Sequence, residues 1–75
     1  MSLDQAIISD IVKMFLRTRD SEETFEVLRP PNEDVYLVRF EDQTLPDIEI
    51  QLPLASDLRL TLPPRLEIAF LRLDR

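Results

Sequence analysis

The most regular pattern in the chain is an alternation of apolar and polar positions between residues 48 and 62. Every even position in it except Ser56 is apolar, and these positions hold Ile48, Ile50, Leu52, Leu54, Leu58, Leu60 and Leu62. One straight strand of this length would span about 50 Å, whereas a folded chain of 75 residues has a radius of gyration of about 11 Å. The segment must therefore turn back, and residues 55–57 have the composition of a turn. The alternation predicts a hairpin of two strands, residues 48–54 and 58–62, whose register stays open.

The first 17 residues carry a helical pattern. Ser2 and Gln5 have the spacing of an N-terminal capping box. The apolar positions that follow form one wide arc, with Leu3, Ile7, Ile11, Met14 and Phe15 in a central stripe and Ile8, Val12 and Leu16 extending it sideways. This arc covers roughly 220°, about twice what a helix on a single surface needs. Such a helix is either wedged deeply in its own domain or covered by a second subunit.

Two strands are expected in the middle of the chain. Residues 24–29 alternate, and residues 29–34 must form a loop because prolines cannot donate backbone hydrogen bonds. Residues 35–41 have apolar side chains on both faces, with Val35 and Leu37 opposite the aromatic side chains. A strand of this kind is central in its sheet or has a partner on its outer side.

The C-terminal pattern permits two interpretations. Pro63 and Pro64 interrupt the preceding segment, and residues 66–73 alternate before they change parity. A bulged strand explains this change and is the favoured prediction. A short helix explains it nearly as well, with an apolar face made by Leu66, Ala69, Phe70 and Leu73.

Together these elements predict an α+β fold. An N-terminal amphipathic helix packs on a small, mainly antiparallel sheet of four to five strands. Residues 1–75 form a single small domain, either complete in itself or cut from a longer chain. A domain of this size is marginally stable unless a disulfide, a metal or a second subunit supports it. The chain has no cysteine and no histidine, so self-association is the support that stays open.

Composition also narrows the choice of partners. The net charge of −6 opposes phosphate backbones and anionic membrane surfaces, so no nucleic acid and no membrane is expected as a partner. No apolar run approaches the ~20 residues of a membrane span, and the N-terminus lacks the features of a signal peptide. The expected location is cytoplasmic. Glycine is absent, which excludes glycine-rich phosphate loops and leaves turns to Pro, Asn, Asp and Ser.

Candidate chemistry is sparse. The acidic clusters lack the spacing of a calcium loop, and solvated loops explain them. Asp47 and Glu49 lie two apart on one strand, and Gln51 stands where a metal-dependent nuclease would need a lysine. Ser9 and Lys13 have i, i+4 spacing, but a solvated helix face explains this pair better than a catalytic one. We therefore expect no enzyme, no cofactor and no metal.

The sequence best fits a non-catalytic protein–protein interaction or accessory module that associates with itself as a homodimer. The interface is expected where apolar side chains exceed the needs of one small core, at Ile8, Val12, Leu16, Val35 and Leu37. The alternative is an acidic inhibitor that occupies a basic, nucleic-acid-binding surface of a partner protein.

Overall fold

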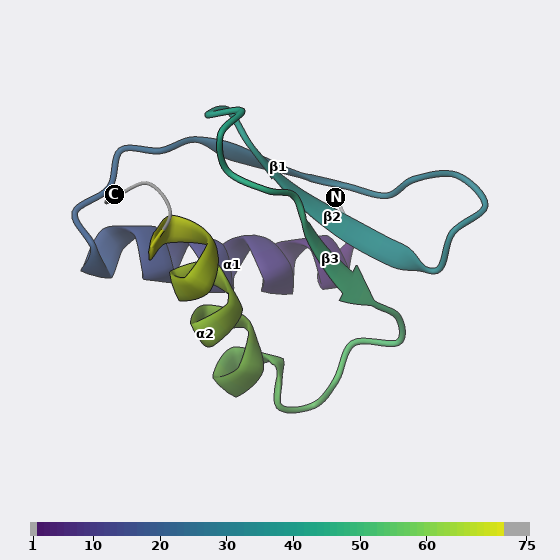
Figure 1. Ribbon diagram of the computed structural model, residues 1–75. Helices are drawn as coiled ribbons and strands as arrows, with labels where there is room; N and C mark the ends of the chain where they lie inside the picture. The colour runs from purple at the N-terminus through teal and green to yellow at the C-terminus, as the bar shows by residue number, and fades with distance from the viewer. Residues whose placement is uncertain (1, 72–75) are drawn as a thin grey trace.

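The computed structural model describes residues 2–71, which form two helices and a three-stranded antiparallel sheet with a radius of gyration of 11.9 Å (Figure 1). In chain order the elements are α1 (Leu3–Thr18), β1 (Phe25–Leu28), β2 (Val35–Phe40), β3 (Ile48–Gln51) and α2 (Leu58–Leu71). The α+β class and the packing of the N-terminal helix on the sheet are confirmed. The sheet has three strands, however, and not four to five.

The sheet is a meander in the order β1-β2-β3. Val27 pairs with Val38, which in turn pairs with Ile48, so these three side chains form one row across the sheet. That row faces the helices, because the apolar side chains of α1 and α2 form one cluster with it. The two helices therefore cover the same face of the sheet, and no helix of residues 2–71 covers the other face (Figure 1).

α1 begins as its local sequence predicts. The Gln5 amide donates to Ser2 Oγ at 3.2 Å, and the Ser2 amide donates to Gln5 Oε1 at 3.1 Å, which completes the capping box. The turn after the helix uses Asp20 at a φ of 53°, and the loop between β1 and β2 uses Asn32 at 66°. These are residue types that tolerate the left-handed region in a chain without glycine.

The predicted hairpin over residues 48–62 is wrong in its second half. The chain leaves the sheet after β3, and α2 begins at Leu58. At this start, the Asp57 carbonyl accepts backbone hydrogen bonds from the amides of Leu60, at 2.8 Å, and Thr61, at 3.0 Å. The strand favoured for residues 66–73 is also wrong over residues 66–71, which are helical. Residues 72 and 73 lie outside the described part of the chain. The buried side chains follow helical spacing, and they are Leu58, Leu62, Leu66, Ala69 and Phe70.

α2 contains two prolines that a helix interior normally excludes. Pro63 and Pro64 cannot donate to the carbonyls of Arg59 and Leu60, which weakens the first turns. The helix is held there by burial instead, because Leu62 on the N-terminal side of the prolines is fully buried in the core. Tertiary packing thus overrides a poor local preference.

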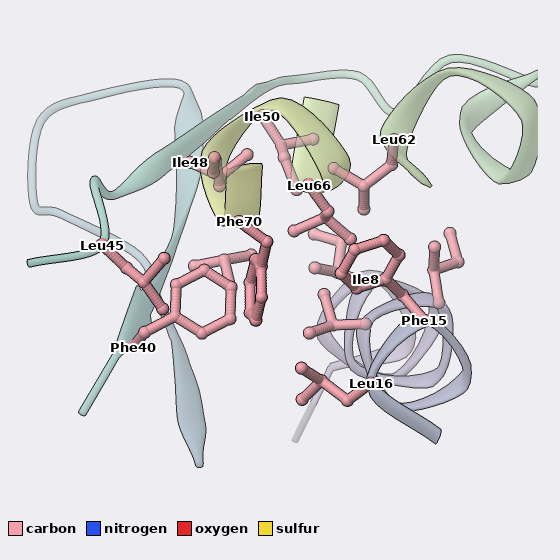
Figure 2. Packing of buried hydrophobic residues seen from close by; sticks show 14 of the residues in the cluster. Ile8, Phe15, Leu16, Phe40, Leu45, Ile48, Ile50, Leu62, Leu66 and Phe70 are labelled. Carbon is pink, nitrogen blue, oxygen red and sulfur yellow. The ribbon is translucent and has the colours of Figure 1, made fainter. Parts of the chain in front are cut away.

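Phe70 joins α2 to α1 and to the sheet within the core. Its ring lies 5.3 Å from the ring of Phe15 on α1 and 5.2 Å from that of Phe40 on β2, both in edge-to-face arrangements. Figure 2 shows the ring between the sheet and α1, with Leu66 one turn away on the same helix. Through this side chain α2 closes the core that α1 and the sheet leave open.

Candidate interaction surfaces

Three of the predicted interface residues lie inside the molecule. Ile8, Val12 and Leu16 are buried in the cluster that α1 forms with α2 and the sheet (Figure 2). The wide arc of α1 is therefore explained by a single copy, since two elements pack against this helix instead of one. These side chains cannot meet a second copy while the domain stays folded.

The other two predicted interface residues lie on the uncovered face of the sheet. The alternation of β2 directs Val35 and Leu37 away from the helices. Val35 is nevertheless buried, whereas Leu37 is half-buried beside its cross-strand neighbour Leu28. Of the five predicted positions, only Leu37 offers accessible apolar surface.

A larger apolar surface lies on α2 and was not predicted. Leu60 is 77% exposed, Ile68 is 63% exposed and Leu71 is 55% exposed. At 100° per residue, these three and the exposed Pro64 fall within an arc of about 80°, opposite the buried side of the helix. We call these four residues the outer stripe of α2. Sequence reasoning missed it because Leu60 looked like part of an alternating strand.

Polar contacts hold α2 so that its outer stripe faces solvent. Arg59 donates from Nη1 to Asp10 Oδ2 on α1 at 3.1 Å, and Arg65 donates from Nη2 to the carbonyl of Glu49 on β3. The first contact is an exposed ion pair and stabilises little by itself. Together with the buried face, the two contacts fix the rotation of the helix about its own axis.

A second surface lies between α1 and the free edge of β1. It is a shallow groove of about 970 Å³, with Ser9, Lys13 and Arg17 on the α1 side and Phe25 and Val27 on the β1 side. Its lining also includes the carboxylates of Asp20, Glu22, Glu23 and Glu26. Ser9 and Lys13, the residues weighed for catalysis, therefore lie on the wall of an open groove.

The backbone of β1 presents hydrogen-bonding groups to this groove. The Glu41 amide donates to the Thr24 carbonyl at 2.9 Å, so the antiparallel alternation turns the backbone groups of Glu26 and Leu28 toward β2. The N–H and C=O groups of Phe25 and Val27 then point away from the sheet. The contact of Gln5 Nε2 with the Val27 carbonyl, at 3.5 Å, agrees with this assignment.

The acidic residues considered for a metal site make ordinary surface contacts. Residues 2–71 contain no group of three His, Cys, Asp or Glu side chains that could hold a metal ion. Asp47 pairs with Arg39 at 3.2 Å, and Glu49 accepts a hydrogen bond from Gln51 at 3.1 Å, so these acids occupy an ordinary polar strand face. Hydrogen bonds from the Thr44 hydroxyl and then from its amide lower the pKa of Asp42, which stabilises a turn.

Comparison with known proteins adds no assignment. No protein-family model, curated protein or solved structure matches this chain. Among the described residues, no helix is long and apolar enough to cross a membrane.

Proposed function

We propose that this protein is a non-catalytic protein–protein interaction module that associates with itself through the outer stripe of α2. The observation that carries the proposal is that α2 is apolar on two opposite faces. The core covers one face, and the other leaves Leu60, Ile68 and Leu71 more than half exposed. The core accounts only for the buried face, and contiguous exposed apolar surface is typical of interaction sites.

The energetics permit an association of moderate strength. Full burial of a Leu or Ile side chain contributes about 1.5–3 kcal/mol. Three such side chains from each of two copies, on average already about one third buried, would together contribute roughly 6–12 kcal/mol. Association itself costs about 4–15 kcal/mol. Because these two ranges overlap, we expect the association to be weak and reversible.

We expect a two-fold symmetric dimer, in which the outer stripe of one copy contacts the outer stripe of the other. In an antiparallel arrangement of two α2 helices, Leu60 of one copy would lie near Leu71 of the other. In this arrangement each side of the stripe lies beside the same side of the second helix, so Arg65 approaches Arg65 of the second copy. Each copy also carries a net charge of −6. We therefore expect added salt to strengthen the dimer by screening like charges.

Sedimentation equilibrium over a micromolar concentration range tests this proposal. The native protein should show a monomer–dimer equilibrium, and Leu60→Glu and Ile68→Glu should shift it to monomer without loss of helix content. Leu3→Glu is the matched control, because Leu3 is also 77% exposed but lies on α1. A native protein that stays monomeric throughout the range would refute self-association, and so would equal effects of Leu60→Glu and Leu3→Glu.

A further inference from the structure

We infer that the open edge of β1 binds an extended, lysine- or arginine-rich segment of a partner protein as a fourth strand of the sheet. This surface is separate from the outer stripe of α2, so the inference holds whether or not two copies associate. Strand addition of this kind takes its affinity from main-chain hydrogen bonds and its selectivity from alternate side chains.

The two edges of the sheet differ in a way that favours β1. The edge at β3 is blocked, because Pro46 and Pro53 flank the strand and Arg65 already donates to the Glu49 carbonyl. Prolines and covering side chains are the common means of closing a sheet edge. β1 contains no proline, and along its outer side the described residues supply only the long contact from Gln5.

The outward groups of β1 provide the hydrogen bonds for a new strand. The N–H and C=O groups of Phe25 and Val27 point into the groove, and no acceptor on another described residue takes a hydrogen bond from either N–H group. The Gln5 side chain contacts the Val27 carbonyl at 3.5 Å, whereas a backbone N–H would approach it to about 2.9 Å. An incoming strand can therefore replace this weak contact with a stronger one.

The groove has the size and charge to select its occupant. Its volume of about 970 Å³ lies at the upper end of the range typical of ligand sites. Four carboxylates and two cationic side chains line it, an excess of two negative charges. A basic segment is thus attracted, and it also fits the net charge of −6.

The positions of these charges predict an alternating segment. The side chain of Glu26 lies on the uncovered face of the sheet, and its cross-strand neighbour Arg39 is paired with Asp47. Lys13 and Arg17 project from α1 on the other side and would repel cations there. Lysine or arginine should therefore occupy every second position of the segment, on the side of Glu26, while apolar or small residues face α1.

Binding of synthetic peptides measured by isothermal titration calorimetry tests the inference. The probe is a short peptide in which lysine alternates with valine and threonine. Two control peptides are used: one carries glutamate in place of lysine, and one carries a central proline. The lysine peptide should bind and should weaken as salt is added, because the charges attract. This salt dependence is opposite to that expected of the α2 dimer.

Variants then locate the site. Glu26→Lys should weaken binding of the lysine peptide about tenfold. Glu33→Lys makes the same change of net charge in the loop after β1 and should have little effect. Val27→Pro removes an outward N–H that β2 does not use, so it should weaken binding while far-UV circular dichroism stays native. Glu26→Lys alone still tests the edge if Val27→Pro unfolds the protein.

Three results would overturn the inference. The first is the absence of binding by the lysine peptide, or binding of the glutamate or proline peptide with the same affinity. The second is an equal effect of Glu26→Lys and Glu33→Lys. The third is loss of the protein's own self-association in Glu26→Lys but not in Leu60→Glu, which would make the β1 edge a contact between copies of this chain.

Discussion

Leu60 and Leu62 lie two positions apart in the sequence, and the fold predicts opposite behaviour for them. Leu60 is 77% exposed and Leu62 is 0% exposed, because α2 turns them to different sides. In the hairpin that the alternating pattern suggested, both would lie on the same face and would contribute equally. Replacing each leucine by alanine therefore distinguishes the helix from the strand.

The magnitudes are well separated. Leu62→Ala removes a fully buried side chain from the cluster that joins α2 to α1. Such substitutions cost about 2–5 kcal/mol, because they lose burial and leave a cavity. Leu60→Ala changes an exposed position in a helix and should alter the free energy of unfolding by less than about 0.5 kcal/mol. For a small domain, the first loss is a large part of the total stability.

Urea denaturation followed by far-UV circular dichroism measures both effects. It should be done at low micromolar concentration so that dimer formation does not contribute to the Leu60 result. The midpoint should fall strongly for Leu62→Ala and stay near the native value for Leu60→Ala, with similar slopes. Equal losses for the two variants would contradict the helical assignment of residues 58–71.

Three further predictions test other contacts. Thr44→Val should raise the pKa of Asp42 toward its ordinary value in an NMR titration, since the Thr44 hydroxyl is the main cause of the lowered pKa. A carboxyl whose pKa is lowered by folding stabilises the folded state at pH values above its unfolded pKa. The difference in stability between Thr44→Val and the native protein should therefore shrink as the pH falls through the pKa of Asp42 in the folded protein. Ser2→Ala should cost about 1 kcal/mol in urea denaturation, because it removes the N-cap of α1. Phe70→Ala should cost about 3–5 kcal/mol in the same assay, because it removes the ring that joins the helices to the sheet.

Local signals in the sequence were sufficient for α1 but not for α2. Ser2 and Gln5 define the start of α1 through contacts three residues apart, so no knowledge of the fold is needed. The start of α2 has no comparable signal beyond Asp57, and two prolines stand inside it. What stabilises α2 is the burial of side chains such as Leu62 against α1 and the sheet, which sequence pattern alone does not display.

The helical spacing of α2 was present but concealed. Leu58, Leu62 and Leu66 recur every four residues, as a buried helix face requires. Leu60 and Ile68 fall between them and turn the series into an apparent alternation. The two residues that make the helix resemble a strand in the sequence, Leu60 and Ile68, are thus exposed and take no part in the core. Local patterns tend to mislead in this way where a surface serves something other than folding.

Three of the five residues predicted for an interface, Ile8, Val12 and Leu16, are buried in the core for a related reason. The width of the apolar arc on α1 indicated correctly that more than one surface covers this helix. It could not indicate whether the second surface belongs to another copy or to the same chain. The favoured prediction of strands over residues 58–62 and 66–73 leaves no second helix to cover Ile8, Val12 and Leu16. Once α2 is in place, the excess of apolar surface moves to its outer stripe.

A dilution series of ¹H–¹⁵N NMR spectra tests the central claim, that the outer stripe of α2 is a contact surface between copies. We predict that the backbone amides of Leu60, Ile68 and Leu71 and their neighbours on α2 shift with protein concentration, and that those of β1 do not. Spectra that stay unchanged over the whole series, or shifts confined to other elements, would contradict it.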